Sequence, residues 1–207
     1  GIPVTAGAQT IDRQCASGLT AIAAAAKQIV IDGNEVVVAG GQDNISAVQK
    51  RYLEWVGAEK DPNVTRHAEH AYMPMLLTAE NVVKKYGISR AAQDEYALSS
   101  QQRTARGQAE GRFAAEIVPI TAAMAVVDKA TNEVSYKEVP LAQDEGNRPD
   151  TTAASLAALQ PVLDGGTVTA GNASQLSDGA SACVLMEARL AAQRGLAPLG
   201  LYRGMTV

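Results

Sequence analysis

One amphipathic helix pattern, followed at once by a short apolar run, constrains the fold more than any other feature. An apolar face at spacings of three and four residues predicts a helix over 16–31, formed by Leu19, Ile22, Ala23, Ala26, Ile29 and Val30. Gly33 suits the left-handed position that ends a helix. Residues 35–39 (EVVVA) then predict a buried strand, and residues 4–11 (VTAGAQTI) a weaker one. Strand, helix and buried strand together predict a βαβ unit with a parallel sheet.

The pattern changes after residue 43. Residues 44–75 are polar and irregular, and 140–152 read as a loop. Helices are expected over 77–86, 89–110 (with Ser89 as N-cap), 152–160 and 187–194. Strands are expected over 115–120, 124–127 and 180–186, with a hairpin-like turn at 128–132 and alternation returning at 167–169. The order predicts a parallel-sheet start, a mixed insertion over about 44–166, and a return to sheet-type sequence.

Composition excludes several classes of function. The net charge of −4 over 207 residues provides no general basic field for nucleic acid. Two cysteines form no disulfide framework, and two histidines far from either cysteine make no zinc site, so no metal is expected. No apolar run approaches about 20 residues, so no membrane span is expected. The first and last residues read as positions inside a domain, which predicts a piece of a longer protein, cytoplasmic unless a preceding segment carried an organelle signal.

Cys15 is the sharpest candidate for chemistry. It lies where the expected first strand ends and the helix begins, in RQCASG (residues 13–18). A thiol there meets the positive end of the helix dipole and unpaired N–H groups, which favour the nucleophilic thiolate. The small Ala16 and Gly18 leave room for a substrate. The alternative is a small buried residue at a turn, because free cysteines are among the most buried residue types.

Other residues carry weaker signals. Cys183 lies within an apolar strand and reads as core filler. His67 and His70 lack a third ligand and read as solvated or loop-packing side chains. The Arg148 guanidinium has a donor fork that suits phosphate, and the turn at 171–174 is small enough to line a ligand. Taken alone, Arg148 is more often a solvated loop residue, and the turn at 171–174 is only a loop.

Taken together, seven segments resemble the thiolases, the acetyl-CoA C-acyltransferases and C-acetyltransferases. They occur in family order and at family-like spacing: RQCASGL (13–19), VVAGG (37–41), TAENV (78–82), DEYALSSQ (94–101), GRF with EIVP (111–119), GTVTAGNAS (166–174) and SDGA (177–180). The similarity covers essentially the whole chain. It implies an α/β fold of layered α-β-α type, with a partial N-terminal domain that carries an inserted α+β loop domain.

The resemblance also implies a division of the chain and a mechanism. Residues 1–43 would be part of the N-terminal domain, 44–166 the loop domain that holds coenzyme A, 167–197 the return, and 198–207 the start of a C-terminal domain. Cys15 matches the nucleophile that carries the acyl group as a thioester. Coenzyme A or acetyl-CoA would be the substrate, with no permanently bound cofactor, and the assembly a homodimer or homotetramer. The implied CoA contacts are Arg148 at the nucleotide, Ser174 at the pantetheine, and Ala170, Ala173, Leu163 and Met75 as its wall.

The chain departs from the family pattern. A thiolase also needs an N-E-A-F asparagine, a G-H-P histidine and a second cysteine in C-x-G, and the 207 residues contain none of these motifs. Pro74 stands where some relatives place a histidine near the CoA pocket. The parent protein is therefore expected to be an enzyme of fatty acid β-oxidation or its biosynthetic reverse, and this chain alone inactive. A non-catalytic CoA- or lipid-binding thiolase-like protein and a ketoacyl synthase-like condensing enzyme are the alternatives.

Overall fold

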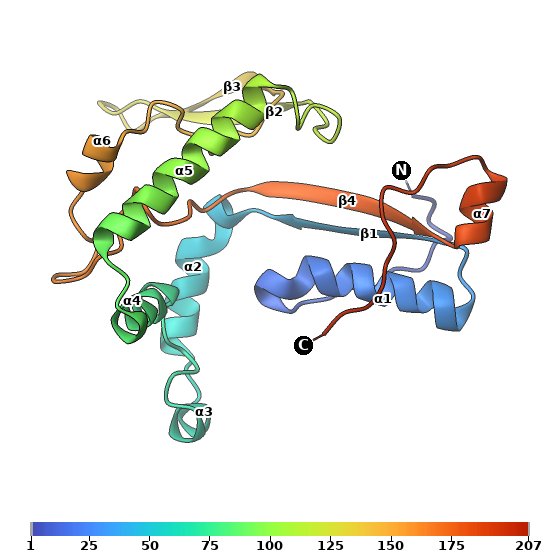
Figure 1. Cartoon of the computed structure of the whole chain (residues 1–207), viewed down its shortest axis with the longest axis horizontal. Helices are drawn as coiled ribbons and strands as arrows, with labels where there is room; N and C mark the ends of the chain where they lie inside the picture. The colour runs from blue at the N-terminus through green and yellow to red at the C-terminus, as the bar shows by residue number, and fades with distance from the viewer. Residues whose placement is uncertain (1, 207) are drawn as a thin grey trace. The chain divides into compact units, whose positions relative to one another are not determined.

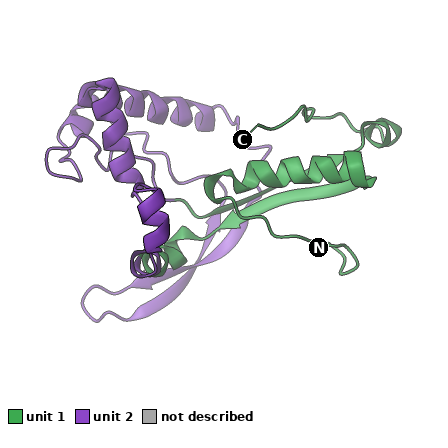
Figure 2. Cartoon of the chain, turned by 90° about the horizontal axis from the view of Figure 1, so that it is seen from below, with its two compact units in different colours: residues 1–53, 177–207 green, residues 54–176 purple. Residues whose placement is uncertain are grey.

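Two units make up the structure, a computed structural model that describes residues 2–206 (Figure 2). The first comprises residues 1–53 and 177–207, and the second comprises residues 54–176. These boundaries lie ten residues beyond the expected ones at 43/44 and 166/167. The assignment of the middle part to coenzyme A binding stays a prediction.

The first unit is one helix on a two-stranded sheet (Figure 1). Strand β1 (Val36–Asp43) pairs with β4 (Gly179–Met186), and α1 (Ser17–Asp32) contacts both strands. A 3-10 turn (Gln14–Ala16) precedes α1, and α7 (Ala188–Gln193) follows β4. The helix packs through small side chains, because its buried residues are Ala23, Ala25 and Ala26, and Ala39 is the buried residue of β1. The expected helix and its end are confirmed: Gly33 adopts φ +76°.

The predicted parallel βαβ unit is wrong for this chain. β1 and β4 are antiparallel, with Val36 opposite Met186 and Asp43 opposite Gly179. Residues 4–11 form no strand, and residues 7–13 adopt no regular structure. The physical reason lies in their side chains: only Val4 and Ile11 are large and apolar, and Gly7 and alanines stabilise a strand poorly.

The sheet is covered by a helix on one face only. Val36, Val38 and Val184 lie on the other face and remain 41%, 47% and 63% exposed. Among the described residues of the first unit, α1 is the one helix that packs extensively on the sheet, so this second face stays open. A second correction concerns Cys183, which was expected in the core and is exposed. It lies opposite Ala39, on the face that α1 covers, but α1 packs mainly on β1 and leaves β4 more open.

By length and composition, the helical stretch Gln14–Asp32 is long and apolar enough to cross a membrane. Of its most apolar 18 residues, 17% are buried in the structure. The expectation that no segment is long and apolar enough to span a membrane is therefore not confirmed. The buried alanines of α1 against β1 and β4 are also what a core helix requires, because a helix on a sheet must bury one apolar stripe.

The second unit is mostly helical. Its elements are the end of α2 (Ile45–Ala58), α3 (Pro62–His67), α4 (Met75–Tyr86), α5 (Arg90–Ala109), the hairpin of β2 (Ile120–Val127) and β3 (Val134–Leu141), and α6 (Ala153–Ala157). The expected start of α5 is confirmed, since Ser89 Oγ accepts a hydrogen bond from the backbone N–H of Ala92 (3.2 Å). The turn at 128–132 is also confirmed as a hairpin turn, because it joins two antiparallel strands.

Three expectations for this unit need correction. Residues 44–75, expected to be irregular, contain α2 and α3. Residues 115–120 and 124–127 were expected as two strands, and one strand, β2, begins only at Ile120. Residues 167–169 form no strand. Polar and apolar residues do alternate at 167–169. Their backbone N–H groups, however, donate to the side chains of Glu80 and Asn172 rather than to a neighbouring strand.

The chain leaves and re-enters the first unit at one place. Asp178, which precedes β4, accepts a 2.9 Å hydrogen bond through Oδ1 from the backbone N–H of Ser46 in the first turn of α2. Asn44 Oδ1 accepts another from the backbone N–H of Ala47 (3.1 Å). These bonds satisfy otherwise unpaired donors of the helix N-terminus. Hydrogen bonds from Ser46 lower the pKa of Asp178, and the bond from the Ser46 backbone N–H contributes most.

Asp178→Asn is expected to lower the free energy of unfolding at neutral pH. A carboxyl whose pKa is lower in the folded chain stabilises the fold above its unfolded pKa, and this contribution disappears as the pH falls through the folded pKa. The difference between wild type and variant should therefore shrink below about pH 4. Urea unfolding at a series of pH values measures it. Asp164→Asn is the control, because no described residue bonds to that carboxylate. A difference independent of pH would contradict the assignment.

Candidate functional site

Cys15 lies in the 3-10 turn that opens α1, and its side chain is exposed. The alternative of a buried filler residue is therefore wrong for this chain. The helix that follows has 16 residues, so its unpaired N–H groups and dipole act at the turn that holds the thiol. The structure thus presents Cys15 to solvent at the positive end of a long helix, as a nucleophile requires.

The turn around Cys15 is held by its own side chains. Ser17 Oγ accepts a hydrogen bond from the backbone N–H of Arg13 (2.7 Å) and donates one to the carbonyl oxygen of Gln14 (2.7 Å). Asp12 Oδ1 accepts a bond from the backbone N–H of Gln14 (2.9 Å). Gln14 itself adopts φ +49°, a left-handed conformation that costs about 1–2 kcal/mol outside glycine. These bonds hold the residue before Cys15 in a conformation it would not adopt alone.

Ser17→Ala is expected to destabilise the turn by about 1 kcal/mol, because two hydrogen bonds are lost. Gln14 should then relax to negative φ and change the reactivity of Cys15, measured as the rate of alkylation by iodoacetamide. Gln14→Gly in the Ser17→Ala background should restore the rate, because glycine adopts positive φ without strain. Equal alkylation rates in all variants would show that the hydrogen bonds of Ser17 do not affect the reactivity of Cys15.

The residues expected to bind coenzyme A all belong to the second unit, whereas Cys15 belongs to the first. Met75, the first residue of α4, is 76% exposed. Ala170, Ala173 and Ser174 are exposed and share one short segment, and Leu163 is half-buried. The exposed apolar atoms of these residues are available to an apolar ligand arm.

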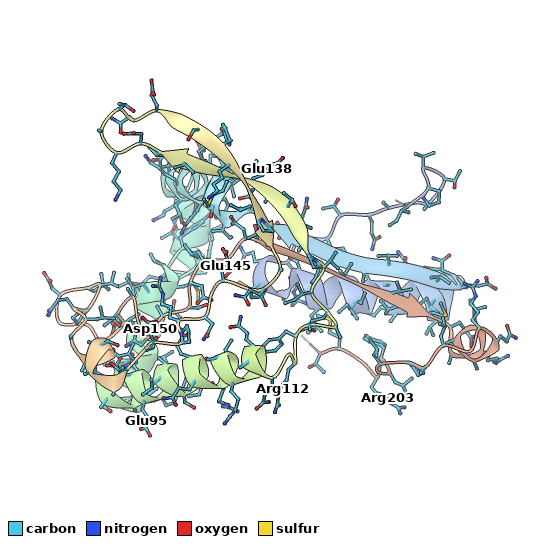
Figure 3. The ribbon with its side chains drawn as sticks, turned by 90° about the horizontal axis from the view of Figure 1, so that it is seen from above. Glu95, Arg112, Glu138, Glu145, Asp150 and Arg203 are labelled. Atoms are coloured by element: carbon cyan, nitrogen blue, oxygen red, sulfur yellow. The ribbon has the colours of Figure 1, made fainter. Side chains whose placement is uncertain are left out.

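Hydrogen bonds to its backbone groups hold Arg148 in place, and its side chain is exposed. Gln101 Oε1, on α5, accepts hydrogen bonds from the backbone N–H of Arg148 (2.8 Å) and from Asn147 Nδ2 (2.8 Å). Thr151 closes the turn by donating from Oγ1 to the Arg148 carbonyl (2.7 Å). Glu145 and Asp150 lie in the same segment, between β3 and α6 (Figure 3), yet no described carboxylate pairs with the guanidinium. The donor fork of Arg148 therefore stays available to an anion.

Sequence reasoning missed two carboxylates that organise the segment 167–174. Glu80, on α4, accepts bonds from the backbone N–H groups of Val168 and Thr167 (2.8 Å each), and these lower its pKa. Asp94, on α5, accepts a bond from Asn172 Nδ2 (3.0 Å). Both lie in runs that carry the family resemblance, TAENV and DEYALSSQ, but helix periodicity gives no sign of contacts with residues 70 to 90 positions away.

His67 and His70 are exposed, in agreement with their reading as solvated residues. Within residues 2–206, no three His, Cys, Asp or Glu side chains gather in a way that would hold a metal ion.

Comparison with known proteins identifies the family. Residues 1–189 match the family described as thiolase, N-terminal domain, and the chain therefore belongs to the thiolase family. It is 42% identical over 210 residues to the 3-ketoacyl-CoA thiolase of Bacillus subtilis (strain 168), covering 100% of this chain and 52% of that protein. The match favours the thiolase interpretation over the ketoacyl synthase-like alternative.

Two solved structures share the fold. The dimeric peroxisomal thiolase of Saccharomyces cerevisiae aligns with a TM-score of 0.75 at 34% identity, over 91% of this chain and 45% of that one. The human mitochondrial 3-ketoacyl-CoA thiolase in complex with CoA aligns with a TM-score of 0.71 at 32% identity, over 91% and 47%. The expected α/β thiolase-like fold is confirmed. The chain spans about half the length of the relatives it matches.

Proposed function

We propose that this chain supplies the acyl-accepting cysteine and the coenzyme A-holding segment of a thiolase-type acyltransferase. The reaction is thiolysis of a 3-ketoacyl-CoA by CoA, in the direction of fatty acid β-oxidation, or the reverse Claisen condensation of acetyl-CoA. The observation that carries the proposal is the exposed Cys15 at the N-terminal turn of α1, in a chain whose residues 1–189 match the thiolase N-terminal domain. The relatives named 3-ketoacyl-CoA thiolase support the degradative direction.

Cys15 acts as the nucleophile in two balanced steps. Its thiolate adds to the keto carbon, and the bond between that carbon and the α-carbon breaks. The bonding electron pair leaves on the α-carbon, which takes up one proton to give acetyl-CoA. The shortened acyl group remains on Cys15 as a thioester. The thiol of a second CoA then loses its proton and attacks this thioester, which releases the acyl-CoA and restores the Cys15 thiolate.

The base and the proton donor for these steps belong to motifs that the 207 residues do not contain, the G-H-P histidine and the C-x-G cysteine. This chain contributes the nucleophile, a turn that presents it, and a surface for the CoA substrate. The activity is therefore to be tested in the protein that carries this chain together with those motifs.

The second unit supplies separate contacts to the two ends of coenzyme A. Arg148 binds phosphate oxygens of the nucleotide, since its guanidinium is exposed and unpaired among the described residues. Ser174 and the small residues Ala170 and Ala173 face the pantetheine, with Leu163 and Met75 against its apolar parts. No permanently bound cofactor is required by this chemistry.

Cys15→Ala is expected to lower kcat for thiolysis of acetoacetyl-CoA by roughly three orders of magnitude or more, because the covalent intermediate cannot form. Peptide mapping by mass spectrometry after incubation with acetyl-CoA should find one acetyl group on Cys15 of the wild type. Cys183→Ser is the matched control, since it removes the other exposed thiol and should leave both results unchanged. Turnover by Cys15→Ala near the wild-type rate would refute the assignment.

Arg148→Ala is expected to raise KM for CoA about tenfold, the effect of losing one charge-assisted contact to phosphate. KM for a pantetheine thioester without the nucleotide should not change. Lys129→Ala removes an exposed cation elsewhere in the second unit and is the control for net charge. An equal rise for both substrates would remove the nucleotide role from Arg148.

For assembly we propose a homodimer or homotetramer, supported by the yeast relative described as dimeric.

Two exposed free cysteines suit a reducing compartment, which supports the cytoplasm. Related proteins described as peroxisomal and mitochondrial make fractionation of the source cells the deciding measurement.

A further inference from the structure

The segment 167–174 is ordered without belonging to any helix or strand. Thr169, near its centre, is completely buried, although the segment has no ladder of backbone hydrogen bonds. A buried irregular backbone must find its partners elsewhere, because unpaired buried polar groups are costly. Apart from two backbone bonds, from the N–H of Val162 to the carbonyl oxygen of Val168 and from the N–H of Ala173 to that of Thr169, the partners are side chains that come from α4, from α5 and from the segment itself.

Glu80 fixes the entry to the segment. Its Oε1 accepts hydrogen bonds from the backbone N–H groups of Thr167 and Val168, both at 2.8 Å, and its Oε2 accepts one from Thr167 Oγ1 at 3.1 Å. Gln93, on α5, donates from Nε2 to the same hydroxyl at 3.0 Å. A single carboxylate thus satisfies two consecutive backbone donors, which a neighbouring strand could not do.

Asp94 fixes the turn that follows. Its Oδ1 accepts a bond from Asn172 Nδ2 at 3.0 Å, and the Asn172 side chain also accepts from the backbone N–H of Thr169 at 2.7 Å. Asp94 is only 8% exposed, and its other oxygen, Oδ2, pairs with Arg90 Nε at 2.8 Å. Its charge is therefore compensated where it lies, as a buried carboxylate requires.

Arg90 extends this connection to α6 and to the residues directly after it. It donates to the carbonyl oxygens of Leu156 (2.7 Å) and Leu159 (3.0 Å). The same two leucines touch the segment: a Cβ added to Gly171 would lie 2.6 Å from Leu156 Cδ2 and 2.5 Å from Leu159 Cδ1. The turn is therefore held from one side by Asp94 and packed from the other by leucine side chains.

We infer that Glu80 and Asp94 are positioning residues that hold the segment 167–174 in its ligand-binding conformation before coenzyme A arrives. The inference rests on the proposed function, in which Ala170, Ala173 and Ser174 of this segment face the pantetheine. A preformed segment binds more tightly than one that must be ordered on binding, because the ordering cost is already met by internal contacts. Both carboxylates act through the segment that they hold, since the oxygens of each bond to groups of the protein, and the role assigned to them is positioning rather than catalysis.

The test uses the protein that carries the whole chain, with CoA as the ligand. Glu80→Ala should raise the Kd for CoA, measured by calorimetry, and the KM for CoA about tenfold, with kcat within about twofold of wild type. Glu80→Gln should have a smaller effect, because its amide oxygen still accepts both backbone N–H groups. A variant that merely loosened the whole fold would not separate KM from kcat in this way.

Asp94→Asn has a matched control on the same helix. Glu95 is the next residue, it is exposed, and Figure 3 shows it on the outer side of α5. Asp94→Asn should weaken CoA binding and speed hydrogen exchange in peptide 167–174, whereas Glu95→Gln should do neither. Exchange in the β2–β3 hairpin reports whether the second unit remains folded in each variant.

The outcomes separate the two proposals. If wild type does not bind CoA, the proposed function fails. If wild type binds CoA and Glu80→Gln, Glu80→Ala and Asp94→Asn bind it with the same Kd, the proposed function stands and the positioning role is refuted. Faster exchange in 167–174 together with a raised Kd supports it. Should Glu80→Ala fail to fold, Glu80→Gln and Asp94→Asn decide the question by the same criterion.

Discussion

The pairing of β1 with β4 is the contact on which the rest of the structure depends. It joins residues 36–43 to residues 179–186, and Asp43 lies opposite Gly179 at the point where the chain leaves and re-enters the first unit. Without β4, β1 has no hydrogen-bonded neighbour among the described residues, and α1 loses one of the two strands it contacts. Asp178 adds a bond to the first turn of α2 at the same place. The middle of the chain is thereby an insertion whose two ends are fixed together.

The two units position their candidate functional residues by different means. Around Cys15 every hydrogen bond joins residues at most four positions apart, so the turn is a local structure with a local strain at Gln14. The segment 167–174 depends instead on contacts from Glu80 and Asp94, which lie 70 to 90 positions earlier in the chain. The turn around Cys15 needs only contacts between residues close in sequence, whereas the second arrangement exists only after α4 and α5 have packed in place.

Local signals predicted α1, α4, α5, α6 and α7, and pointed to Cys15 as the candidate nucleophile. Apolar periodicity and a glycine end predicted α1, and the N-cap Ser89 predicted the start of α5. Cys15 was found by its place before a helix, and its exposure agrees with that reading. The predicted parallel sheet was wrong because the sequence of one strand does not determine whether its neighbour runs parallel or antiparallel to it. Cys183 was wrongly placed in a core for a related reason: burial depends on which layers cover a sheet.

The sequence by itself determined α1 with its glycine end, the N-cap Ser89 of α5, the place of Cys15 before a helix and the membership of the thiolase family, because each depends on residues close together in the chain or on motifs in order. Only the tertiary structure decided that β1 and β4 are antiparallel and that 167–174 is an irregular segment held by carboxylates rather than a strand. The physical reason is that backbone donors accept any suitable partner. Whether that partner is a strand or the side chain of Glu80 is settled by which elements pack together.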